Sequence, residues 1–307
     1  MVPALAFAQG ETSHKHCVCG SRTLPVGEHV THGDVLEYKP LPKEGGTLQG
    51  NYFIDKGSIS LSESIVIEEG TILNICLNGS SLYRNFDGNL FINHGTLNIG
   101  TCDKSDISDW YTNSGTSEYE KCKKLSYQGA IRGEGGTRGT LVETTGDVNL
   151  YGGSLTYSEN NSNGAIVNVL QGGKFTMNGG SLNSGYSING GLIYNEGNVV
   201  INDGILVAGS ADKGGAILNR GDVTLKGGTY AANKADLGSA IYNQYGTLKL
   251  QGNLAIKENN IYTENGKLEI TGQLSGYIGI DTSVEGIIAT GANNYTLTER
   301  DESVFTQ

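Results

Sequence analysis

Histidine and cysteine gather near the start of the chain in a pattern that could bind a metal ion. Residues 14–32 hold four of the five histidines and two of the five cysteines of the protein. Imidazole and thiolate are common zinc ligands, and two pairs joined by a short loop can close a tetrahedral site. We therefore expect Cys17, Cys19, His29 and His32 to bind a structural zinc ion that covers the start of the fold.

Other interpretations of the cysteines stay open. The Cys-x-Cys spacing is tighter than the usual Cys-x-x-Cys of zinc sites. The cluster also fits a disulfide with another cysteine, an unstructured His-rich tract or a packed cap. Cys102 and Cys122 flank a divergent stretch and would either close it as a disulfide or remain reduced. Cys76 lies in an apolar run and is expected to be a small core residue.

A column of apolar and aromatic residues recurs at a regular spacing and could contact a ligand. Val167, Tyr194, Leu218 and Tyr242 occupy the same place in four similar segments. If the neighbouring residues point inward, these four point outward and form a column that stacks sugar rings or anchors a protein. The alternative is that a loop or another domain covers them. Trp110, Tyr111 and Tyr119, in a divergent stretch, form a second candidate surface.

These residues belong to a repeat with a period near 24. Gly164-Ala-Ile-Val-Asn168, Gly191-Leu-Ile-Tyr-Asn195, Gly215-Ala-Ile-Leu-Asn219 and Ser239-Ala-Ile-Tyr-Asn243 align with one another. A second set follows each of them, as in Gly221-Asp-Val-Thr-Leu-Lys-Gly-Gly228, and a third set begins at residues such as Leu206. Each repeat therefore holds three short strands with period-two patterning, separated by glycine and asparagine corners.

A unit of three short strands cannot bury its apolar side alone, whereas stacked units can. The repeat therefore predicts an all-β protein, a single-stranded right-handed parallel β-helix of about ten coils with three strands per coil. Within the four aligned segments, Asn168, Asn195, Asn219 and Asn243 should form an amide ladder just inside one corner. The residues expected to face the core are Ile166, Ile193, Ile217, Ile241, Val148, Leu150, Phe175, Met177, Val199, Ile201, Val223, Leu225, Leu248 and Leu250.

Catalytic carboxylates are harder to find. Cleavage of a glycosidic bond needs two acids that converge on it. One acid per coil lies beside a corner glycine, at Asp147, Asp203, Asp212, Asp222 and Asp236, which is typical of turn formation and surface charge. Acids on neighbouring coils could still meet in space, so an enzyme remains the second hypothesis.

Composition and charge exclude several other classes. The chain has 307 residues, 47 of them glycine, with 4 prolines, 17% charged residues and a formal net charge of −11. This acidity argues against a nucleic-acid partner. No run of apolar residues is long enough for a membrane-spanning helix. Ala6-Phe7-Ala8 after an apolar stretch fits a signal-peptide cleavage site and predicts a secreted or wall-associated bacterial protein.

The sequence predicts four regions. Residues 1–8 are expected to be a signal-peptide remnant, and residues 9–44 a Cys/His-rich segment or cap. Residues 45–292 should form the β-helix, with an inserted loop at 103–127. The glycine-poor segment 293–307 is expected to connect to a further part of a longer protein.

The repeat motifs resemble those of known surface proteins. Gly215-Ala-Ile and Tyr230-x-x-Asn233 are similar to motifs of polymorphic outer-membrane proteins and autotransporter passengers, β-helical surface proteins that are often adhesins. Gly70-Thr-Ile-Leu-Asn-Ile-Cys-Leu-Asn-Gly79 and Tyr295-Thr-Leu-Thr-Glu299 look more like coils of large Gram-positive surface proteins. The resemblance covers about residues 45–300. It implies a β-helix exposed at the cell surface, and it says little about activity.

The leading expectation is therefore a secreted or cell-surface β-helix that binds a host or environmental glycan or protein without catalysis. A polysaccharide-degrading hydrolase or lyase, or its carbohydrate-binding accessory, is the alternative. A purely structural stalk is the third hypothesis.

Overall fold

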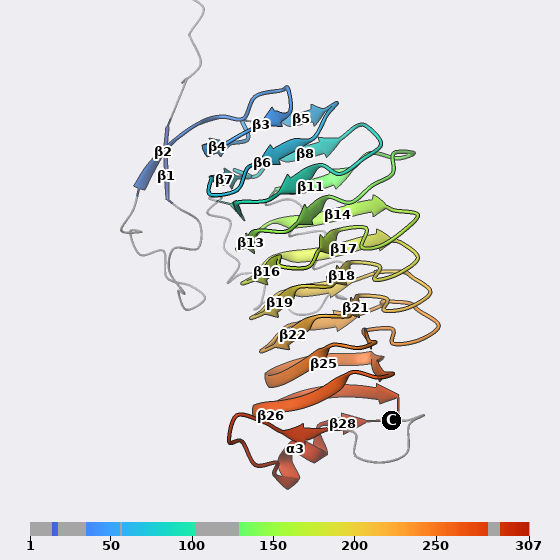
Figure 1. Ribbon diagram of the computed structural model, residues 1–307. Helices are drawn as coiled ribbons and strands as arrows, with labels where there is room; N and C mark the ends of the chain where they lie inside the picture. The colour runs from blue at the N-terminus through green and yellow to red at the C-terminus, as the bar shows by residue number, and fades with distance from the viewer. Residues whose placement is uncertain (1–13, 18–34, 56, 102–128, 282–288, 307) are drawn as a thin grey trace, which may run out of the picture.

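The computed structural model describes residues 14–17, 35–55, 57–101, 129–281 and 289–306. The chain winds into a β-solenoid of about nine turns, with parallel strands that pair with equivalents about 24 residues away and essentially no helix (Figure 1). The predicted fold class is confirmed, with slightly fewer turns than the ten expected.

Three strand columns, named face 1, face 2 and face 3 in chain order, run along the solenoid. Each strand of a face pairs in register with the strand one turn away. Face 1 contains β3 (Gly46–Thr47), β6 (Ile65–Ile67), β9 (Phe91–Asn93), β12 (Val142–Thr144), β15 (Val167–Val169), β18 (Ile193–Asn195), β21 (Ile217–Asn219) and β24 (Ile241–Asn243).

Faces 2 and 3 complete each turn. Face 2 contains β4 (Gly50–Phe53), β7 (Ile72–Cys76), β10 (Thr96–Gly100), β13 (Asp147–Leu150), β16 (Lys174–Met177), β19 (Asn198–Ile201), β22 (Asp222–Leu225) and β27 (Thr290–Gly291). Face 3 contains β5 (Ser58–Leu61), β8 (Ser81–Arg84), β11 (Ala130–Gly133), β14 (Ser154–Glu159), β17 (Ser181–Tyr186), β20 (Ile205–Val207), β23 (Thr229–Ala231) and β28 (Phe305–Thr306). The long strands β25 (Thr247–Thr263) and β26 (Lys267–Asp281) run through all three faces.

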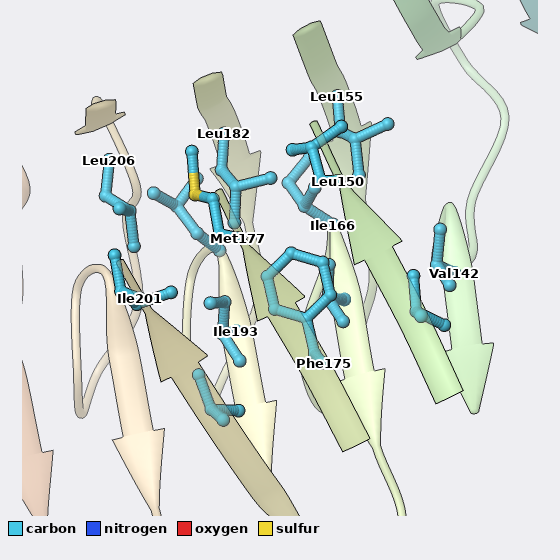
Figure 2. Close-up of a cluster of buried hydrophobic side chains, with 14 of the residues drawn as sticks. Val142, Leu150, Leu155, Ile166, Phe175, Met177, Leu182, Ile193, Ile201 and Leu206 are labelled. Atoms are coloured by element: carbon cyan, nitrogen blue, oxygen red, sulfur yellow. The ribbon is translucent and has the colours of Figure 1, made fainter. Parts of the chain in front are cut away.

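The core fills the inside of the solenoid with aliphatic side chains, together with Phe175 and Met177 (Figure 2). All fourteen residues predicted to face inward are fully buried in this core, so the period-two patterning is confirmed. Alternation places every second side chain of a short strand on one side, and stacking the turns then excludes water from that side.

An amide ladder lies inside face 1, as predicted, but with a different membership. Asn195 Nδ2 donates to Asn219 Oδ1 at 2.8 Å, and Asn219 Nδ2 donates to Asn243 Oδ1 at 2.9 Å. The prediction for Asn168 was wrong, because Asn168 pairs with Tyr194 and Val169 takes the ladder position. This register buries both Val167 and Val169 in the core, whereas the predicted alignment would have turned both of them outward.

Glycines at one corner allow the chain to turn into face 1. Gly190, Gly214 and Gly238 precede successive strands and have φ values of 64°, 68° and 63°. A Cβ on Gly214 would lie 2.4 Å from the carbonyl oxygen of Ile217. Both the left-handed backbone and the close approach therefore require glycine at this corner.

The two ends of the described solenoid differ in their covering. At the start, β1 (His14–Cys17) pairs antiparallel with β2 (Val35–Pro40), and β2 continues into a parallel pairing with β4. Cys76 is buried beside Tyr38 and Phe53, as expected of a small apolar residue. At the last turn, β28 pairs with β26, and the short helix α3 (Glu299–Ser303) contacts both strands. The repeat pattern does not predict this helix.

The pairing between β10 and β13 marks an interruption of the repeat. Asn149 donates to Asn98 across a separation of 51 residues, where about 24 is usual. The inserted loop expected at 103–127 falls in this interval and lies outside the described residues.

Candidate functional site

The column predicted to bind a ligand is not an exposed surface. Val167 points into the core, because β15 pairs with β18 one residue away from the alignment used in the prediction. Tyr194, Leu218 and Tyr242 do form one column on the outer side of face 1, but their exposed fractions are only 4%, 2% and 0%. The alternative interpretation, in which other parts of the chain cover the column, fits these values.

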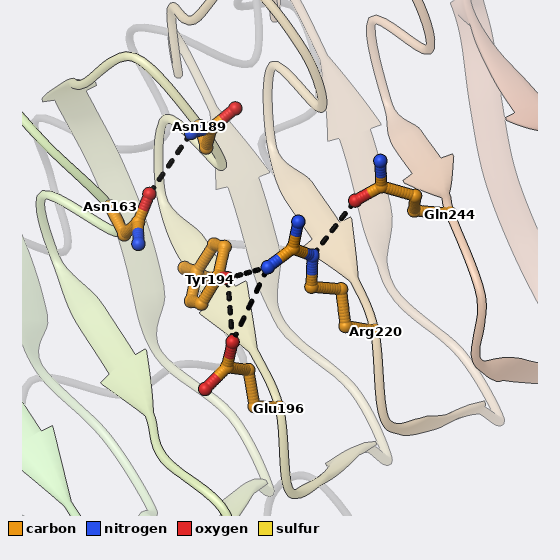
Figure 3. A network of polar contacts seen from close by, with 6 residues as sticks. All are labelled: Asn163, Asn189, Tyr194, Glu196, Arg220 and Gln244. Atoms are coloured by element: carbon orange, nitrogen blue, oxygen red, sulfur yellow. Dashed lines mark hydrogen bonds and ion pairs between the residues drawn. The ribbon is translucent and has the colours of Figure 1, made fainter.

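Tyr194 is held in a polar network that joins three turns (Figure 3). Its hydroxyl donates to Glu196 Oε1 at 2.7 Å and accepts a hydrogen bond from Arg220 Nη1 at 2.9 Å. Arg220 also donates from Nε to Gln244 Oε1 at 2.8 Å. Burial, followed by the neighbouring Glu196, raises the pKa of Tyr194. This ring therefore joins turns to one another and offers little surface to a ligand.

The other tyrosine of the predicted column is covered in a similar way. The ring of Tyr242 stacks on that of Tyr262 with a centroid distance of 5.5 Å, and Lys213 Nζ lies 5.0 Å from its centroid. Leu237, from the turn that precedes β24, packs against the same cluster. Burial, with the Glu264 carboxylate in second place, raises the pKa of Tyr242. The outer side of face 1 is therefore a second packed layer.

The remaining predicted site residues lie mostly outside the described residues. Trp110, Tyr111 and Tyr119 do so, as do Cys19, His29 and His32, and Cys102 and Cys122. Cys17 is the last residue of β1. Within the described ranges, no group of three or more His, Cys, Asp or Glu side chains could hold a metal ion. The zinc hypothesis and the disulfide hypothesis both remain predictions.

A different surface carries exposed aromatic side chains. Tyr157 at the end of β14 is 45% exposed and Tyr186 at the end of β17 is 47% exposed. They border a small surface depression whose free space, about 10 Å³, is enough for roughly one water molecule. We call this depression and the residues that line it the tyrosine site. The lining residues are Glu134, Gly135, Gly136, Thr137, Tyr157, Ser158, Glu159 and Tyr186.

The backbone of Tyr157 adopts a left-handed conformation that recurs along this corner of the solenoid. Its φ is 54°, and the equivalent positions on the next three turns hold Ser184, Ala208 and Ala232, with φ between 51° and 56°. A left-handed conformation costs an ordinary residue roughly 1–2 kcal/mol. Because four successive turns share this backbone conformation, it belongs to the corner of the fold, and Tyr157 differs from its equivalents in carrying a large exposed ring there.

A stacked cation holds the tyrosine ring in place. The guanidinium carbon of Arg132 lies 5.3 Å from the ring centroid of Tyr83 and 5.5 Å from that of Tyr157. Both distances are within the range of a cation–π contact. The ring of Tyr157 is therefore supported from within the molecule, and ordering it on binding costs little conformational entropy.

Two carboxylates accompany the rings. Glu134 and Glu159 line the same depression, and Glu134 Oε1 accepts a hydrogen bond from Ser60 Oγ at 3.2 Å. Carboxylate oxygens accept hydrogen bonds from hydroxyl groups, and tyrosine rings pack against apolar faces. The tyrosine site can therefore contact a ligand that alternates hydroxyl groups with apolar faces.

This site was not predicted from the sequence, because the third strand of each repeat was recognised only by an apolar residue at its start, such as Leu206. A signal was present, since a tyrosine stands where the later repeats carry serine or alanine. The proximity of Glu134 to Glu159 had no comparable signal, because it depends on how the turn at 134–137 meets the end of β14.

No family model, no curated protein and no solved structure matches this chain. No helix among the described residues is long and apolar enough to cross a membrane. The observations therefore define the protein by its architecture, a parallel β-solenoid with an exposed tyrosine site on one face.

Proposed function

We propose that this protein is a secreted or cell-surface β-solenoid that binds a glycan or a protein without catalysis. The observation that supports this most directly is the pair of exposed tyrosines beside two carboxylates in the tyrosine site. Exposed aromatic residues in a patch are typical of recognition surfaces, whereas scattered single residues need no explanation. The small-x-small pattern Ala6-Phe7-Ala8 after an apolar stretch, which fits a signal-peptide cleavage site, supports a location outside the cell.

The shape of the depression favours an extended ligand. Pockets that enclose a small molecule usually measure about 300–1,000 Å³. The tyrosine site offers far less space than this, about 10 Å³, so a ligand would lie across it and contact the exposed rings from outside. A glycan chain suits this surface well, because its sugar rings present apolar faces to Tyr157 and Tyr186 and hydroxyl groups to Glu134 and Glu159.

An array of neutral and acidic glycans tests the proposal. Tyr157→Ala and Tyr186→Ser replace each ring with a residue found one turn or two turns further along, so the fold should tolerate both changes. We expect each variant to weaken binding by about tenfold or more, as for an aromatic anchor. Tyr277→Ala, which removes a 62% exposed tyrosine elsewhere on face 3, is the matched control and should bind normally.

Binding that survives both substitutions would contradict the tyrosine site as the location. Wild-type protein that binds no glycan and no protein from a host-surface extract would instead favour the structural stalk.

Sugar cleavage is the second candidate, because Glu134 and Glu159 line one depression. A glycoside hydrolase uses two such acids on either side of the scissile bond. Incubation of the protein with polysaccharides, followed by measurement of new reducing ends, separates the two functions. Release of sugar that is abolished in both Glu134→Gln and Glu159→Gln would replace the non-catalytic proposal with a hydrolase.

A further inference from the structure

Among the residues that the structure describes, Arg84 is the largest fully buried side chain, with an exposed fraction of 0%. It lies at the end of β8 on face 3. Its Nη1 donates to the carbonyl oxygen of Gly88 at 2.7 Å. Its Nη2 donates to Ser158 Oγ at 3.1 Å and to the carbonyl oxygen of Thr137 at 3.3 Å. The guanidinium thus connects segments from three turns.

Two glycines leave the space that the guanidinium occupies. A Cβ on Gly133 would lie 2.9 Å from Arg84 Nη2, and a Cβ on Gly139 would lie 2.4 Å from Nη1. Gly139 also has a φ of 143°. Backbone atoms approach at least as closely, since the Gly133 Cβ would lie 2.8 Å from the Tyr157 carbonyl oxygen and the Gly139 Cβ 2.1 Å from the Gly88 carbonyl oxygen. A side chain at either position would therefore disturb both the backbone and the guanidinium.

The three partners of the guanidinium are neutral groups. Burying a charge is costly, and a cation without a contacting carboxylate contributes little to stability. Burial lowers the pKa of Arg84, while the nearby Asp87 opposes this effect. The planar guanidinium nevertheless offers five N–H donors in a fixed fork, whereas the lysine ammonium offers three from a single nitrogen and methionine offers none.

Two of these partners line the tyrosine site. Thr137 belongs to the turn that carries Glu134, and Ser158 stands between Tyr157 and Glu159. Ser158 Oγ also donates to the carbonyl oxygen of Gly139 at 2.8 Å, and the Gly139 amide donates to the carbonyl oxygen of Glu159 at 2.7 Å. The turn at 134–139 is thus joined to the end of β14 through Arg84 and Ser158.

We propose that Arg84 is a positioning residue of the tyrosine site, which fixes the turn bearing Glu134 against the strand end bearing Tyr157 and Glu159. Its effect on a ligand rests on the proposed function, whereas its effect on the turn does not. Removal of Arg84 should loosen the turn and disperse the ligand-binding groups while the rest of the solenoid stays folded.

Hydrogen exchange followed by mass spectrometry tests the positioning directly. In Arg84→Met, which removes the buried charge but keeps much of the volume, we expect exchange in peptides spanning 134–139 to rise by about tenfold or more. Arg84→Lys should give the same local change, because one ammonium cannot reach all three partners. Peptides from β19 and β22 should keep their protection. Unchanged exchange at 134–139 in both variants would overturn the proposal.

Binding is measured on the same proteins with cellohexaose, xylohexaose and chitohexaose as probes. Leu225→Ala, a core change on face 2 away from the site, is the control for general loss of stability. We expect any probe that binds the wild type to bind Arg84→Met with an affinity that is lower by about tenfold or more. The same probe should bind Leu225→Ala with wild-type affinity at temperatures below the melting temperature of that variant. If Arg84→Met and Leu225→Ala lost probe affinity equally, Arg84 would have a general structural role and the proposal would be overturned.

The two proposals fail separately. If the wild type binds none of the probes and no glycan on the array, the proposed function fails, and the exchange experiment still decides whether Arg84 positions the turn.

Discussion

Single side chains inside the solenoid act on more than one turn. Asn219 accepts a hydrogen bond from Asn195 and donates to Asn243 and to the Thr247 carbonyl oxygen. The residue is fully buried, so no water can replace a lost partner. A buried polar group left without its partner costs about 1–3 kcal/mol, which makes the ladder sensitive to the loss of a single amide.

We expect Asn219→Ala to lower the free energy of unfolding by about 2 kcal/mol, because Asn195 loses its acceptor and Asn243 its donor. Chemical denaturation measures the change. Asn202→Ala is the control, since Asn202 also donates to an asparagine one turn away, Asn178, but lies partly in water. If Asn219→Ala lowered the free energy of unfolding no more than Asn202→Ala does, burial would not explain the importance of the ladder.

The strands themselves were largely predictable, and the register was less so. Alternation between apolar and polar residues assigned the inward side chains correctly, because only one side of each strand is buried and the apolar residues must lie on that side. It failed at Asn168, where the aligned asparagine suggested one register and the flanking valines Val167 and Val169 determined another. The tyrosine site and α3 depend on how turns and ends pack, which a repeat pattern does not describe.

Corner glycines should be the least replaceable residues of the strand connections. We expect Gly214→Ala to lower the free energy of unfolding by about 2 kcal/mol or more, because its φ is 68° and the new Cβ would meet the Ile217 carbonyl oxygen. Gly135→Ala is the matched control, since open space surrounds that position. Thermal melting of both variants measures the difference, and equal stabilities would contradict the steric argument.

At the scale of the molecule, each turn contacts only its neighbours, so stability accumulates along the axis and the last turns need a cover. Tyr295, Leu297 and Val304 pack on the final part of the core. Asp301 in α3 holds this cover in place, because its carboxylate accepts hydrogen bonds from the Leu274 and Thr298 amides and from the hydroxyls of Tyr295 and Thr298.

This cover should weaken in acid. Burial alone would raise the pKa of Asp301, but the four hydrogen bonds outweigh it and lower the pKa from 3.8 to about 2. A lowered pKa contributes stability that is present above pH 3.8 and lost as the pH falls towards 2. We expect Asp301→Asn to melt at a lower temperature than the wild type at pH 5, with the difference shrinking between pH 4 and pH 2. A difference that stays constant across this range would contradict the assignment.

The pairing of Asn98 with Asn149 also bears on how such a molecule can change over generations. Strands on neighbouring turns of a face pair in register whether about 24 or 51 residues separate them along the chain. The chain can thus accept an insertion after β10 while the strands of the turns on either side remain paired in register. Foreign peptides grafted after β10 would test that tolerance. Insertions of this kind would let the same solenoid acquire new binding specificities without a change in its strand pairing.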